Sequence, residues 1–273
     1  WFYLVTQTPL LRGHTLFRFN ALEWRVVREY LAVGLPIGLQ ISFEVFIFNF
    51  AAIMMGWIGT VTLAAHHIAL NLAALSFMLP LGLSFAVGIR VGQAAGGKRW
   101  DQLRLAGLSN FALAGLFMAF MAILFLVFRN FLPTLFLGAE VENSDAVVLL
   151  AAQFLIVASI FQIGDGIQVV AIGALRGLKD VRIPTALVFF AFWVICIPLG
   201  IFLAFQVDSE SQFLGISWTF LGGQTWGMGW GGIGIWIGMA VGLCLNALIL
   251  TLRFLCITRP GNLEARSGGG IPG

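Results

Sequence analysis

The sequence predicts an all-α polytopic membrane protein with six transmembrane helices, and three properties of its composition support that prediction. Hydrophobic residues make up 60% of the 273 residues and charged residues only 10%, against roughly 25% charged residues in an ordinary soluble domain. The mean hydropathy of +0.97, with 26 Phe and 9 Trp, leaves too little polar surface to cover a soluble fold. Composition therefore excludes a soluble enzyme and a disordered chain. The three cysteines, an odd number, do not suit a disulfide scaffold.

A transmembrane helix needs about 20 predominantly apolar residues, and six stretches of the chain reach that length. The six stretches are residues 31–56, 63–92, 105–128, 146–175, 184–205 and 231–255. Pro36 lies inside the first of them and Pro80 inside the second. Pro184 begins the fifth, which also contains Pro198. Each proline marks a kink or a helix start, because proline has no backbone N–H to donate.

The connections between these spans alternate in charge. Fourteen of the 15 Lys and Arg residues fall before the first span, around the second-to-third and fourth-to-fifth connections, and at the C-terminal end. The other three connections hold Arg129 beside five acidic residues. The positive-inside rule then places both termini in the cytoplasm. Topology also accounts for the pI near 9.1, so no nucleic-acid partner is expected.

The two ends of the chain suggest a piece of a longer protein. The sequence opens with Trp1 rather than Met, in an apolar run typical of the end of a membrane span. We expect residues 1–30 to hold that end and a cytoplasmic connector, and residues 31–255 to form the six-helix transmembrane region. The Gly-rich residues 256–273 are expected to form a cytoplasmic tail, since they offer nothing to join a core.

Two acidic residues, Glu44 and Asp165, lie inside predicted spans rather than in loops. A carboxylate at the centre of a membrane helix costs roughly 2.5–3.5 kcal/mol on insertion scales, which makes such residues functional candidates. Glu44 lies 13 residues and Asp165 10 residues from the predicted cytoplasmic end of its span, at depths of about 20 and 15 Å. We therefore expect the two acids to share one cavity. The alternative is that each is a protonated acid that joins two helices.

Amide side chains accompany both acids. Gln40 precedes Glu44 by four residues, and Gln162 and Gln168 lie three residues to either side of Asp165. Residues at these spacings share one helix face. Each acid is therefore predicted to lie on a polar stripe.

Several other features of the spans have two interpretations. Gly164 and Gly166 flank Asp165, where they either loosen the helix and expose carbonyls to a cation or allow close helix packing. Asn71 and Asn246 lie mid-span and either line the cavity or, as we favour, bond across helices. The sequence contains no Gly-rich phosphate loop, catalytic triad or Cys/His metal spacing. We expect no enzyme activity and no cofactor.

Five segments of the chain form a pattern that is specific in order and spacing. They read GLPIGLQISFE at residues 34–44, AAHHIALN at 64–71, IRVGQ at 89–93, FQIGDGIQ at 161–168 and GALRGLKD at 173–180. This pattern resembles the multidrug and toxic compound extrusion (MATE) transporters, and in particular their NorM-like branch. The resemblance runs from about residue 20 to residue 255.

The resemblance implies a six-transmembrane-helix lobe of a twelve-helix MATE-type transporter. This chain would be the C-terminal lobe, and its partner would be the N-terminal six-helix lobe of the same protein. The implied activity is a cation-coupled antiporter in the bacterial inner (plasma) membrane, which exports amphipathic organic cations and drugs in exchange for Na⁺ or H⁺.

By the same resemblance, Glu44 and Asp165 are the cation-binding carboxylates, and the only metal expected is Na⁺ at this pair. The expected substrate- or cavity-lining residues are Gln40, Gln162, Gln168, Asn71 and Phe161. Phe161 is a departure from the family pattern, since some members carry a tyrosine at this place. The missing hydroxyl leaves the coupling ion open between Na⁺ and H⁺.

Two other functions remain open at this point. A flippase for lipid-linked precursors, from the same superfamily, would need a basic cavity for pyrophosphate, whereas the basic residues here gather at the predicted cytoplasmic ends. A non-transporting, half-size membrane protein would use the two acids only to join helices. Fold alone does not give function, and the intramembrane acids favour the antiporter.

Overall fold

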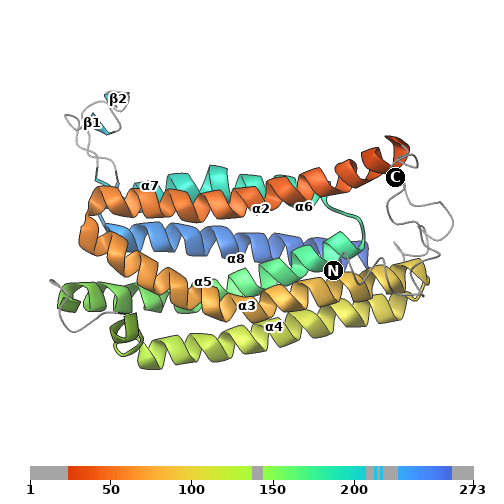
Figure 1. Cartoon of the computed structure of the whole chain (residues 1–273), viewed down its shortest axis with the longest axis horizontal. Helices are drawn as coiled ribbons and strands as arrows, with labels where there is room; N and C mark the ends of the chain where they lie inside the picture. Colours follow the sequence, from red (N-terminus) through yellow and green to blue (C-terminus); the bar gives the residue numbers. More distant parts are fainter. Residues whose placement is uncertain (1–23, 137–143, 207–211, 214–215, 218–226, 260–273) are drawn as a thin grey trace, which may run out of the picture.

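The computed structural model describes residues 24–136, 144–206, 212–213, 216–217 and 227–259, and these residues are almost entirely helical (Figure 1). The helical segments are α2 (Trp24–Ile58), α3 (Thr60–Gly96), α4 (Trp100–Phe128), η2 (Leu132–Phe136), α5 (Ser144–Gly177), α6 (Arg182–Phe189), η3 (Phe190–Cys196), α7 (Ile197–Ala204) and α8 (Gly232–Ile257). One short antiparallel pair, β1 (Gln212–Phe213) and β2 (Ile216–Ser217), lies between α7 and α8.

Six helical stretches are long and apolar enough to cross a membrane, which confirms the predicted number of spans. The helices are longer than the predicted spans, and α2 begins at Trp24 rather than at residue 31. Hydropathy falls at the first polar residue, whereas backbone hydrogen bonding continues into the polar flanks. Of the predicted connector, residues 24–30 belong to α2 and residues 1–23 lie outside the described residues, as do residues 260–273.

The fifth span consists of α6, η3 and α7 in direct succession, and η3 is a π-helix. The amide of Ile197 donates to the carbonyl of Phe192, five residues earlier. Pro198 follows at once and has no N–H to offer to the preceding turn. A wider π turn accommodates that break without ending the span.

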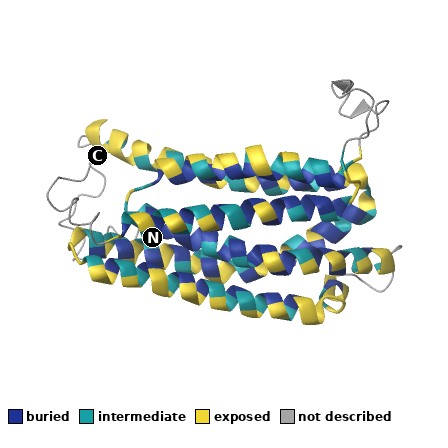
Figure 2. Cartoon of the chain, turned by 180° about the vertical axis from the view of Figure 1, so that it is seen from behind, coloured by how far each residue is buried: buried dark blue, intermediate teal, exposed yellow. Residues whose placement is uncertain are grey.

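α5 is the central helix of the bundle. It packs against α3, α4 and α8, while α2 lies mainly against α3 and α6. The helices run nearly side by side, with α2, α6 and α7 on one side and α3 and α4 on the other (Figure 1). Half of the most apolar stretch of α5 is buried, against 11% of that of α2. Buried residues are concentrated in the interior of the bundle (Figure 2). Of the six spans, α2 has the smallest buried share of its most apolar stretch.

An aromatic cluster around Trp236 of α8 joins α8 to α3 and α5. The Trp236 ring stacks on Phe154 with the ring centres 5.7 Å apart, and it meets Phe161 at 5.4 Å and His66 at 5.5 Å edge-on. All four side chains are buried. Aromatic pairs add about 0.5–1.5 kcal/mol each beyond their area burial, so this cluster fixes the three central helices against one another.

Glycines allow α5 to approach its neighbours closely. A Cβ atom at Gly173 would lie 2.2 Å from the carbonyl oxygen of Ser84 on α3, and one at Gly164 would lie 2.9 Å from Sγ of Cys244 on α8. α5 is also an unbroken α-helix. Of the two interpretations of the glycines beside Asp165, the structure therefore supports close packing rather than a loosened helix.

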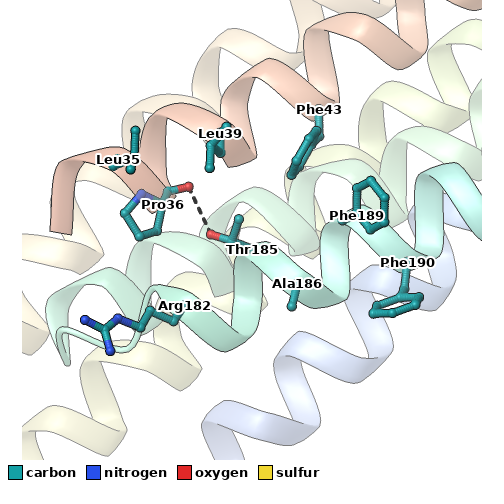
Figure 3. A pocket seen from close by; sticks show the side chains of 9 residues that line it. All are labelled: Leu35, Pro36, Leu39, Phe43, Arg182, Thr185, Ala186, Phe189 and Phe190. Atoms are coloured by element: carbon teal, nitrogen blue, oxygen red, sulfur yellow. Dashed lines mark hydrogen bonds between the residues drawn. The ribbon is translucent and has the colours of Figure 1, made fainter. Parts of the chain in front are cut away.

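α2 and α6 border an open groove of about 370 Å³ (Figure 3). Leu35, Leu39 and Phe43 of α2 line one side of the groove. The hydroxyl of Thr185 on α6 donates to the carbonyl of Pro36 at 3.0 Å. This bond links the two helices next to the proline of α2.

Basic residues gather where α3, α5 and α8 finish and α2 begins, and we call this the basic end of the bundle. They include Lys98, Lys179, Arg182 and Arg253. Arg253 donates to both carboxylate oxygens of Asp180, at 2.7 and 3.1 Å. The ion pair ties α8 to the connection between α5 and α6.

Candidate cation-binding site

The two intramembrane acids come from different helices, and a hydrogen bond between α2 and α5 links Glu44 to the helix face that carries Asp165. Nε2 of Gln168, on α5, donates to Oε1 of Glu44, on α2, at 2.5 Å. Asp165 lies three residues before Gln168 and so shares its helix face. We call Glu44, Asp165 and Gln168 the carboxylate layer.

The carboxylate layer is partly or fully shielded from solvent, which makes its charges costly. Glu44 and Asp165 are half-buried, and Gln168 is fully buried. A buried carboxylate needs hydrogen bonds or a counter-charge, and the donor from Gln168 supplies one such bond to Glu44. Two like charges in one layer repel each other, so the layer favours a bound proton or cation that removes part of the negative charge.

A second polar contact lies nearer to the basic end. Nη2 of Arg176, in the last turn of α5, lies 3.5 Å from Oε1 of Gln40 on α2. Gln40 is fully buried and precedes Glu44 by one helical turn. Arg176 is absent from the predicted site residues, because an Arg at the end of a span is explained by topology alone. Its spacing of eleven residues after Asp165, which is about three helical turns, is the signal that could have found it, since this spacing places it on the same face of α5.

A third polar contact lies on the other side of Asp165, towards α3. The hydroxyl oxygen of Ser76 lies 3.0 Å from Oε1 of Gln162 and 2.8 Å from the carbonyl oxygen of Ala73, and its single proton is shared between these two acceptors. Gln162 is buried. It therefore lines the α3 side of α5 rather than the α2 side, where Glu44 lies.

Several buried amide atoms find no hydrogen-bond partner among the described residues. They are Nε2 of Gln40, Nε2 of Gln162 and Oε1 of Gln168. Buried polar atoms in proteins are nearly always paired, and internal water commonly supplies the partner. Oε1 of Gln168 adds a neutral acceptor beside the two carboxylates, and hard cations prefer oxygen ligands of both kinds.

The structure brings together four of the seven residues predicted for the site. Glu44 and Gln168 are joined by a hydrogen bond between α2 and α5, Asp165 lies on the helix face of Gln168, and Gln40 lies one turn from Glu44, while Gln162 contacts α3 instead.

The other two, Asn71 and Phe161, lie apart from the interface. Asn71 is exposed on α3, because its position falls on the outward face of that helix. Phe161 is 1% exposed and packs against Trp236, so its ring faces the core rather than an open space. Asn246 is buried and makes no hydrogen bond with any described residue. The prediction that Asn246 bonds across helices is therefore wrong for the described residues.

The chain is similar to known proteins over most of its length. Residues 36–202 match the model of the MatE family. The chain is 39% identical over 253 residues to the probable multidrug resistance protein NorM of Brucella suis biovar 1, covering 92% of this chain and 49% of that protein. It is 38% identical over 264 residues to the protein of the same description from Agrobacterium fabrum, covering 97% and 52%.

Solved structures show the same fold. The eukaryotic MATE transporter AtDTX14 superposes with a TM-score of 0.76 at 21% identity, over 97% of this chain and 53% of that one. An outward-facing multidrug resistance MATE family transporter of the MOP superfamily superposes with a TM-score of 0.73 at 18% identity, over 96% and 53%.

The chain therefore spans about half the length of the relatives that it matches. Its six apolar helices make it a multi-pass membrane protein. The family match extends over more than half of the chain and includes both intramembrane acids. The protein belongs to the MatE family.

Proposed function

We propose that this chain is one lobe of a cation-coupled antiporter that exports amphipathic organic cations, with Glu44 and Asp165 as the groups that exchange coupling ion for substrate. The observation that carries this proposal is the carboxylate layer. Gln168 donates a hydrogen bond to Glu44 of α2 and lies on the same face of α5 as Asp165. The relatives named as probable multidrug resistance proteins support the substrate class.

The exchange follows from the energetics of buried charge. An ionised acid pair in apolar surroundings is costly, and either the coupling ion or a substrate cation relieves that cost. The two ligands therefore compete for one site. Each ligand shifts the transporter between its inward- and outward-facing states only by its difference in affinity for those states. Coupling then requires that both ligands depend on Glu44 and Asp165.

The wider arrangement is part of the same proposal. A second six-helix lobe, the N-terminal lobe of the same protein, would complete the cleft in which substrate moves, since the relatives are about twice as long as this chain. The bacterial relatives support an inner (plasma) membrane location, and the charge distribution supports a cytoplasmic position for both termini. The protein would act as a transporter rather than an enzyme, and Na⁺ or H⁺ would be its coupling ion.

The polar groups of the site disfavour the flippase. A pyrophosphate substrate needs cationic or donor groups at the site, whereas the carboxylate layer presents two acids and the free acceptor of Gln168. The relatives named as probable multidrug resistance proteins disfavour the non-transporting protein.

Dye efflux from inverted vesicles tests the proposal. The chain would be expressed with any coding sequence that precedes Trp1 in its gene, and Na⁺ and proton gradients would be imposed separately. Glu44→Gln and Asp165→Asn should each abolish gradient-driven dye movement while the protein stays inserted.

Matched controls are available among exposed acids. Glu29 lies on the same helix as Glu44 with its side chain 74% exposed, and Asp101 is exposed in the first turn of α4. Glu29→Gln and Asp101→Asn should transport as the unchanged protein does. Gradient-driven efflux that survives in both Glu44→Gln and Asp165→Asn would refute the proposal.

A further inference from the structure

The contact between Gln40 and Arg176 has a different chemical character from the carboxylate layer. Oε1 of Gln40 already accepts from Arg176, and the atoms left unpaired are Nε2 of Gln40 and Nε of Arg176. Both are hydrogen-bond donors. We call this pair the donor layer. It offers a cation no free oxygen, whereas the carboxylate layer offers several.

The directions of the helices explain why these two side chains meet. α2 begins at the basic end and α5 finishes there (Figure 1). Helical side chains tilt towards the N-terminus of their own helix. Gln40 therefore points from α2 towards the basic end, and Arg176 points from α5 back into the bundle. Long polar side chains bridge the two helices here, since α2 packs mainly against α3 and α6.

The charge of Arg176 is not neutralised by a direct ion pair. Among the described residues, no carboxylate lies within ion-pair distance of its guanidinium group, whereas Arg253 is paired with Asp180. Arg176 is half-buried and its Nε atom is inaccessible to solvent. Its positive field is therefore weakly screened. That field extends along the α2–α5 interface towards Glu44.

We propose that Arg176, held by Gln40, forms a charge barrier that separates the carboxylate layer from the basic end and prevents the coupling cation from passing without exchange. The proposal rests on the proposed function, because it assumes that a cation occupies Glu44 and Asp165. An arginine on a transport path excludes cations through its charge and its donor-only chemistry. Arg176 is then a selectivity residue that suppresses leak and contacts neither acid.

The expected size of the effect follows from helix geometry. Arg176 lies eight residues beyond Gln168, which is about 12 Å along α5. A unit positive charge at that distance, at an effective dielectric constant of about 20, changes the energy of a cation by an amount that corresponds to about tenfold in rate. A cation that passes the guanidinium group comes closer than this, so Arg176→Gln should raise substrate-independent cation flux by about tenfold or more.

The test uses proteoliposomes that contain the full polypeptide and no substrate. Influx of radioactive Na⁺ and of protons, followed with an internal pH dye, would be measured under imposed gradients. Arg176→Gln should leak, Arg176→Lys should stay close to the unchanged protein, and Arg90→Gln, which alters an exposed arginine of α3, should have no effect. The double variant Arg176→Gln/Glu44→Gln should lose the leak, because the cation must first occupy the carboxylate layer.

A second variant distinguishes loss of the barrier from misfolding of the protein. Gln40→Glu keeps the size of the side chain, converts the donor layer into an acceptor and neutralises Arg176, so it should also leak. Flux in Arg176→Gln and Gln40→Glu that equals the unchanged protein, at equal insertion, would overturn the barrier and leave the proposed function untouched. Conversely, a Glu44-dependent leak in Arg176→Gln, together with no coupled dye efflux by the unchanged protein, would support the barrier and refute the antiporter.

Discussion

Replacing Gly173 with alanine should force α3 and α5 apart at their closest approach. The new Cβ atom would lie 2.2 Å from the carbonyl oxygen of Ser84 and 2.8 Å from its Cα and carbonyl carbon. These are backbone atoms, so no side-chain rotation relieves the overlap. An ordinary contact begins at 3.4 Å, and the two helices must therefore separate locally by more than 1 Å.

The cost of that separation follows from measured overpacking. Extra atoms in a well-packed interior destabilise proteins by about 1–3 kcal/mol. For a domain of this size, each kcal/mol corresponds to about 2–4 °C in Tm, so Tm should fall by about 2–12 °C. Gly82→Ala is the matched control on α3, because its Cβ atom would have no neighbour within 4 Å. Its higher helix propensity should stabilise the protein by about 0.5–1 kcal/mol.

The assay is thermal unfolding of the purified protein in detergent, followed by loss of the monodisperse peak in size-exclusion chromatography. The two alanine substitutions should move Tm in opposite directions. A Tm for Gly173→Ala that equals or exceeds that of Gly82→Ala would refute the close packing of α3 on α5. It would also remove the basis for placing Gln162 beside Ser76, since that hydrogen bond crosses the same pair of helices.

Two further substitutions test the packing of α8. Arg253→Gln should lower stability by about 1–2 kcal/mol, because it removes a partly buried, two-bond ion pair with Asp180. A double-mutant cycle with Asp180→Asn measures the coupling, and strictly additive effects would contradict the pair. Trp236→Ala should cost about 3–5 kcal/mol, since the ring is fully buried between Phe154 and Phe161. The same chromatographic assay checks this, and a Tm within about 2 °C of the unchanged protein would contradict the cluster.

The sequence by itself determined the number of spans and the two unusual acids. Both are local properties. A bilayer requires each crossing segment to be apolar over its whole length, so hydropathy finds six helices without knowledge of their packing. A carboxylate inside such a segment is costly wherever the segment lies. Glu44 and Asp165 therefore stand out from the sequence of their own spans.

Only the tertiary structure decided which side chains meet. In a soluble helix an apolar stripe marks the buried face, but a membrane helix is apolar on its lipid side as well as on its protein side. The outward position of Asn71 and the buried position of Phe161 were therefore not readable from spacing.

The same reason explains why Arg176 could not be predicted as a site residue. Positive charge at a span end predicts topology, and Arg176 is such a residue. Its side chain turns back into the bundle only because α5 runs towards the basic end, where α2 presents Gln40. Local composition determined where the helices are, and the packing of α2 against its neighbours decided that Glu44 meets Gln168 and Gln40 meets Arg176.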